Sequence, residues 1–87
     1  MTQVKHITLD VLKPHHPTIL ELASAVAALA GDYHVSITVQ TVDEKTESVL
    51  IAIDGTNIDM AALDETIRSL GASIHSVDKV QVVGGEP

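Results

Sequence analysis

The chain contains no cysteine, no phenylalanine and no tryptophan. Without cysteine it can form no disulfide and no thiolate metal site, and it has no cysteine nucleophile. Tyr33 is the single aromatic residue, so the core must be aliphatic, built from Val, Ile, Leu and Ala. Proteins that bind single-stranded nucleic acid usually stack the bases on aromatic side chains, and this composition argues against that function.

Basic residues are also scarce. Five Lys and Arg stand against twelve Asp and Glu, which gives a formal net charge of -7. Such a surface repels polyanions, so we expect no nucleic acid and no anionic membrane among the partners. The sequence has no apolar run long enough to span a bilayer and no apolar leader at its N-terminus. We therefore expect a soluble, cytoplasmic protein.

The patterns that are present predict a small α+β fold. Four stretches alternate like half-buried strands, and two have the spacing of amphipathic helices. In chain order they are strand 4–12, helix 17–30, strand 33–42, strand 47–54, helix 59–70 and strand 73–83.

This order predicts a single ferredoxin-like domain over residues 1–87. The βαββαβ sandwich would have a four-stranded antiparallel sheet of order 4-1-3-2 and both helices on one face. We expect residues 83–87 to form a flexible tail.

The sheet face away from the helices is the first candidate for function. Even-numbered residues of the first three strands point to it, and they are small and mildly polar with some apolar groups. A short chain has a thin core, so partner subunits are a plausible supplement. We expect this face to form an oligomer interface. Its predicted residues are His6, Thr8, His34, Ser36 and Thr38.

Two adjacent histidines stand between two prolines in "KPHHP". Metal-binding histidines of one element normally converge, as at i and i+4 on a helix, whereas adjacent side chains in a turn diverge. The pattern therefore favours a strand-to-helix turn, with His16 near the helix N-cap and at most His15 joining a site.

The segment "IHSVD" opens the last strand, which would pair with the first. Asp10, His75 and Asp78 could then form a site for a divalent cation such as calcium, since hard cations prefer several oxygen ligands. The alternative is a hydrogen-bonded network that fixes strand register or an intersubunit contact. The acid-rich loop "VDEKTE", which holds Asp43 and Glu47, could also bind calcium, or it could simply be solvated.

We expect no enzyme activity. The sequence has no phosphate-cradling glycine loop and no metalloprotease helix, and no nucleophile–base pair is evident. Ser76 and His75 are adjacent on a strand, so their side chains point to opposite faces.

Several segments of the sequence resemble the archaeal family known as domain of unknown function 211, over about residues 4–83. They are "LDVLKPH" at 9–15, "VDEKTESV" at 42–49, "IAIDG" at 51–55 and "GASIHSVDKV" at 71–80. The resemblance implies a ferredoxin-like fold and closed, ring-like homo-oligomers, and the family has no agreed reaction. These segments include His15, Asp43, Glu47 and Asp78.

We therefore expect a non-catalytic, self-assembling binding or scaffold protein that binds a divalent cation and no other cofactor. The alternative is a sensing module resembling the amino-acid-binding ACT domains, which share the βαββαβ order. It would hold a small molecule at a subunit interface, near residues 13–17 or 54–58.

Overall fold

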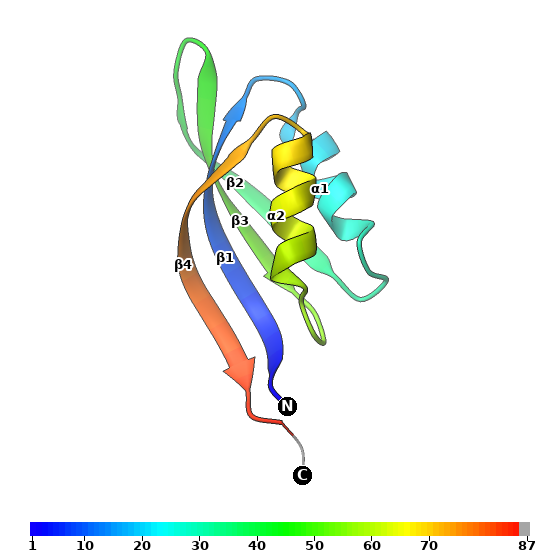
Figure 1. Ribbon diagram of the computed structural model, residues 1–87. Helices are drawn as coiled ribbons and strands as arrows, with labels where there is room; N and C mark the ends of the chain where they lie inside the picture. Colours follow the sequence, from blue (N-terminus) through cyan, green and yellow to red (C-terminus); the bar gives the residue numbers. More distant parts are fainter. Residues whose placement is uncertain (86–87) are drawn as a thin grey trace.

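The computed structural model describes residues 1–85, which form a sheet with two helices packed on one of its faces (Figure 1). The elements are β1 (Gln3–Pro14), α1 (Ile19–Ala27), β2 (His34–Val42), β3 (Thr46–Asp54), α2 (Met60–Ser69) and β4 (Ser73–Val83). The strand order β2-β3-β1-β4 is the predicted order read from the other edge, and every neighbouring pair is antiparallel. The predicted ferredoxin-like βαββαβ fold is confirmed.

Both helices are shorter than the sequence pattern predicts, and each begins directly after a capping side chain. At α1 the Thr18 hydroxyl accepts from the Glu21 amide at 3.2 Å, and the Glu21 carboxylate accepts from the Thr18 amide at 2.8 Å. This reciprocal pair satisfies two amides that have no partner inside the helix. Asp59 caps α2 by accepting from the Ala62 amide at 3.1 Å. Gly71, with φ of 85°, follows α2 in the left-handed conformation that favours glycine.

The core lies between the sheet and the helices and is aliphatic, as predicted. Odd-numbered residues of the two central strands point into it, together with one stripe from each helix. Its strand and helix members are Ile7, Leu9, Val11, Val49, Ile51, Ile53, Leu22, Val26, Leu63 and Ile67. Within residues 1–85, no helix is long and apolar enough to cross a membrane.

Strand β4 departs from a regular ladder. Its register against β1 shifts between the pairs Thr8–Lys79 and Leu9–Val77, which leaves Asp78 as an extra residue. A second shift leaves His75 extra in the same way. Such bulges bend a strand and redirect its side chains. Four β4 valines are between 48% and 54% exposed: Val77, Val80, Val82 and Val83.

The lower part of β4 runs beside β1 beyond the ends of the helices (Figure 1). The molecule is accordingly elongated, with principal extents of 51 × 22 × 18 Å. Val83 pairs with Gln3, so the tail predicted at 83–87 overlaps the end of the strand. Residues 86 and 87 lie outside the described residues.

The core assignment predicts a contrast between two leucines. Leu9 is fully buried in the central strand, whereas Leu20 on α1 is 74% exposed. We expect Leu9→Ala to lower the free energy of unfolding by about 2–5 kcal/mol, because it removes buried methyl groups and leaves a cavity. The control Leu20→Ala should change it by less than about 0.5 kcal/mol. Urea denaturation followed by circular dichroism measures both, and equal effects would contradict this description of the core.

Candidate functional site

A buried lysine is the centre of the first polar cluster. Lys13 is an odd-numbered residue of β1, so it points to the core side, and it is only 1% exposed. Its ammonium donates to Glu47 Oε1 at 2.9 Å, to the Pro14 carbonyl at 2.8 Å and, more weakly, to the His15 carbonyl at 3.5 Å. Lys13 and Glu47 are directly opposite in the β1–β3 register. The lysine charge is therefore buried with a counter-charge and with oxygen acceptors for its protons.

His15 shares the same carboxylate. Its Nδ1 lies 3.0 Å from Glu47 Oε2, and its Nε2 lies 3.0 Å from the carbonyl oxygen of Glu44. A carboxylate and a carbonyl can only accept, so both ring nitrogens donate and the ring is an imidazolium. The hydrogen bond to Glu47, followed by that to the Glu44 carbonyl, raises the pKa of His15. The hydrogen bonds from His15 and then Lys13 lower the pKa of Glu47.

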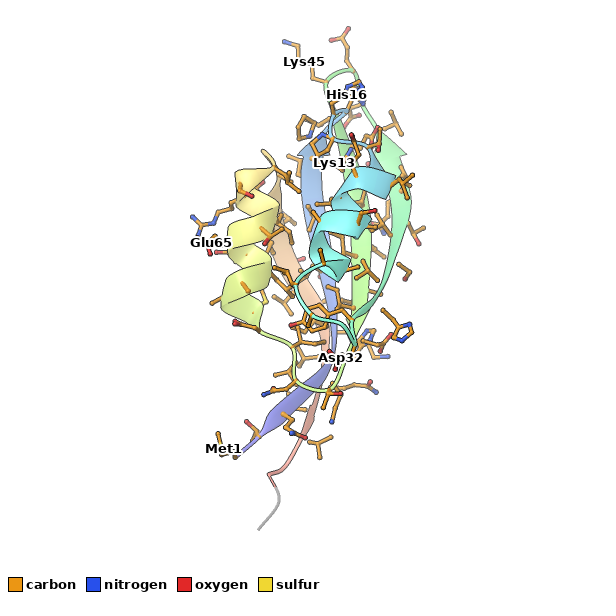
Figure 2. All side chains as sticks on the ribbon, turned by 90° about the vertical axis from the view of Figure 1, so that its right-hand side faces the viewer. Met1, Lys13, His16, Asp32, Lys45 and Glu65 are labelled. Atoms are coloured by element: carbon orange, nitrogen blue, oxygen red, sulfur yellow. The ribbon has the colours of Figure 1, made fainter. Side chains whose placement is uncertain are left out.

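This arrangement changes the interpretation of the residues predicted around the hairpin. The structure brings His15 and Glu47 together, but a doubly protonated ring has no lone pair for a metal. The Asp43 backbone amide donates to the Thr46 carbonyl at 2.8 Å and closes the hairpin. The ammonium of Lys13 already donates to one oxygen of the Glu47 carboxylate. Figure 2 shows Lys13 at the same end of the molecule as His16 and the hairpin residue Lys45.

Lys13 was not among the predicted site residues, although the sequence carried a signal for it. In "ITLDVLK", lysine follows Ile7, Leu9 and Val11 on the apolar side of the alternation. A charged residue at such a position is either at the end of the strand or buried with a partner. Its partner could be found only from the pairing of β1 with β3.

A second cluster forms a shallow depression of about 310 Å³ on the open sheet face. It is lined by Asp10, Leu12, Ser48 and His75, which come from three adjacent strands. The Ser48 hydroxyl lies 3.4 Å from Asp10 Oδ1, at the long limit of a hydrogen bond. The bulge at His75 lets its side chain share this depression with Asp10.

Asp78 does not line the depression. Its carboxylate accepts from the Ser76 hydroxyl at 2.6 Å, within β4 itself. Two of the three predicted metal ligands therefore meet, and the third is held at a different bulge. Among residues 1–85, no group of three His, Asp or Glu side chains stands ready to hold a metal ion. The calcium site stays a prediction.

The third cluster lies on the predicted interface. Strand register aligns His34, Asp54 and His6 in one row, with Ser36, Ala52 and Thr8 in the next. Directly opposite residues share a face, and Thr38 lies in the following row. The five predicted interface residues thus lie on one face of the sheet. His6 Nδ1 is 2.7 Å from Asp54 Oδ1, and His6 Nε2 is 2.7 Å from Thr8 Oγ1.

The buried lysine predicts a specific ranking of variants. Lys13→Met removes the buried charge and leaves oxygen acceptors without a donor, so we expect a loss of about 1–3 kcal/mol in the free energy of unfolding. Glu47→Gln should be more damaging, because it leaves the buried ammonium without a counter-charge. The double variant should be less destabilised than the two single effects added together. Urea denaturation of all four proteins gives the coupling energy, and strict additivity would count against a functional ion pair.

The shared carboxylate also predicts how stability depends on pH. The pKa of His15 is raised above its ordinary value of 6.5, so its contribution is complete below that pH and is lost as pH rises through the raised pKa. The pKa of Glu47 is lowered below 4.5, so its contribution is present above that pH and is lost as pH falls through the lowered pKa. The cluster should stabilise the fold most between these values.

His15→Gln isolates the histidine part of this prediction. We expect the stability difference between the wild type and this variant to be largest near pH 6 and to shrink as the solution becomes alkaline. The control is His16→Gln, which changes the neighbouring histidine outside the cluster. Thermal unfolding across pH measures both variants, and a His15 effect that grows above pH 7 would contradict the imidazolium assignment.

The chain is similar to known proteins over most of its length. A family model for domain of unknown function 211, described as uncharacterized ArCR, matches residues 5–86. An uncharacterized protein of the archaeon Methanocaldococcus jannaschii is 42% identical over 80 residues, which are 92% of this chain and 82% of that protein. The match extends over nearly all of the strands and helices described above. The chain therefore belongs to the domain of unknown function 211 family.

Proposed function

We propose that the chain is a non-catalytic, cytoplasmic protein that assembles with copies of itself into a ring and serves as a binding or scaffold module. One observation carries this proposal. Both helices lie on the same side of the sheet, and within residues 1–85 no element covers the other side (Figure 1). The uncovered face presents hydroxyl, imidazole and apolar groups together.

The chemistry of this face suits contact with another protein. Leu50 and Ala52 lie in its centre, between the hydroxyls of Ser36 and Thr38 on one side and the polar residues of β1 on the other. The edges of the sheet are formed by different strands, β2 and β4. A contact between the β2 edge of one copy and the β4 edge of the next would therefore join unlike surfaces in a head-to-tail arrangement. Such contacts close into rings when the rotation between subunits allows it.

A divalent cation such as calcium fits this proposal at the depression on the same face. Asp10 and His75 supply one carboxylate and one imidazole there. Calcium takes six to eight oxygen ligands, so a second chain would have to contribute further carboxylates. The net charge of -7 favours cation uptake. Cation binding and assembly would then strengthen each other.

Native mass spectrometry with and without calcium tests the assembly and reports any bound ion. We expect an oligomer of defined size, stabilised by calcium. The double variant Ser36→Lys/Thr38→Lys should shift the mass to monomer, because it adds two like charges to the contact face. The matched control Leu20→Lys changes an exposed residue of α1 and should leave the oligomer intact.

A wild-type chain that remains monomeric across chain, salt and calcium concentrations would overturn the assembly. The cation is tested separately with Asp10→Asn and His75→Ala. Both should abolish the effect of calcium, and an unchanged effect in either variant would exclude the depression as its site.

The depression also favours a second candidate, a sensing module similar to ACT domains. Its volume of about 310 Å³ and its mixed polar and apolar lining would admit a small metabolite. Thermal-shift screening against amino acids, nucleotides and cations separates the two candidates. A shift with one metabolite and none with metals would favour sensing.

A further inference from the structure

A carboxylate, an imidazole and a hydroxyl form a continuous hydrogen-bonded chain on the open face of the sheet. Asp54 Oδ1 lies 2.7 Å from His6 Nδ1, and His6 Nε2 lies 2.7 Å from Thr8 Oγ1. His6 and Thr8 are two residues apart on β1 and so point to the same face. The β1–β3 register places Asp54 directly opposite His6.

The order of these three groups determines what each can do. A carboxylate only accepts, so the proton of the neutral His6 ring lies on Nδ1, facing Asp54. The lone pair then lies on Nε2, where it accepts the hydrogen bond of the Thr8 hydroxyl. The His6 side chain is 13% exposed and its contact with Thr8 is partly buried, whereas the Asp54 side chain is 62% exposed. A base held by a carboxylate and bonded to a hydroxyl is the arrangement that activates an oxygen nucleophile.

Thr8 is partly exposed on the open face, between residues of two flanking strands. Its opposite residue on β3 is Ala52, whose side chain is a single methyl group. Its opposite residue on β4 is Lys79. A flexible ammonium at this position favours the negative charge that develops on a carbonyl oxygen under attack.

We propose that Thr8 is a covalent acylation site that accepts an acyl group from activated esters. The Thr8 oxygen attacks the ester carbonyl, its proton passes to His6 Nε2, and the bond to the leaving alcohol breaks. His6 returns the proton to the departing oxygen, so the products are acyl-threonine and the free alcohol. The step modifies the protein once per chain, and it goes beyond the proposed assembly without requiring it.

The probe is p-nitrophenyl acetate, followed by peptide mapping of the full chain by mass spectrometry. Thr38 lies on the same face of the sheet, on β2, and is the matched control hydroxyl. We expect Thr8 to be acetylated roughly 100-fold faster than Thr38, which is the size of effect that a positioned general base gives. Hydroxylamine removes the acetyl group from a threonine ester and leaves lysine amides, so it separates the two products.

Three variants assign the effect to the hydrogen-bonded chain. His6→Gln and Asp54→Asn should each reduce Thr8 acetylation, the first by roughly 100-fold. Thr8→Ser should retain the reaction, because it keeps the hydroxyl at the same position. Circular dichroism establishes that each variant is folded before its rate is compared.

The experiment is run over a series of chain concentrations, so that the proposed assembly is dissociated at the lowest of them and both threonines are then accessible. A strictly monomeric chain would therefore overturn the proposed assembly and not this inference. Acetylation of Thr8 no faster than that of Thr38 at every concentration, or unaffected by His6→Gln in the folded protein, would overturn the acylation site.

Discussion

The alternation of side chains along β1 is the constraint on which the rest of the structure depends. Successive side chains of this strand point to opposite faces of the sheet, and the helices cover only one face (Figure 1), so its odd and even residues lie in two different environments. Ile7, Leu9 and Val11 complete the core, whereas His6 and Thr8 reach the open face. A shift of one residue in register would exchange these two sets. Packing of the aliphatic core therefore also positions the polar groups on the opposite side.

The end of β1 shows how the same alternation can bury a charge. Lys13 takes the next odd position, and its ammonium lies among oxygens of Pro14, His15 and Glu47. Removing an ammonium from water is costly, and a buried ion pair is weak evidence of net stabilisation. What the pair does reflect is strand register, because Lys13 and Glu47 are directly opposite in the pairing of β1 with β3. The Glu47 carboxylate then holds His15 as a second cation, which ties the turn after β1 to the β2–β3 hairpin.

The sequence was sufficient for the strands, the aliphatic core and the topology, because these follow from apolar periodicity. It was insufficient for contacts that depend on pairing between strands. The bulges at His75 and Asp78 could not be read from "IHSVD", since a bulge exists only relative to a partner strand, and they separate Asp78 from Asp10. The contact between Asp54 and His6 had the same origin, because these residues meet only across β3 and β1, whereas His6 and Thr8 already share a face within β1. Lys13 was different, since its odd position was visible in the sequence.

The polar groups of the open face are already partly paired with one another, and this affects the cost of covering them. His6 contacts Asp54 and Thr8, and Asp10 has a long contact with the Ser48 hydroxyl. Burial of a polar group is expensive mainly when it loses water without gaining another partner. Groups that are paired within the chain keep those partners when a second protein displaces the water. A face of this composition can therefore be covered at less cost than one whose side chains are bonded only to solvent.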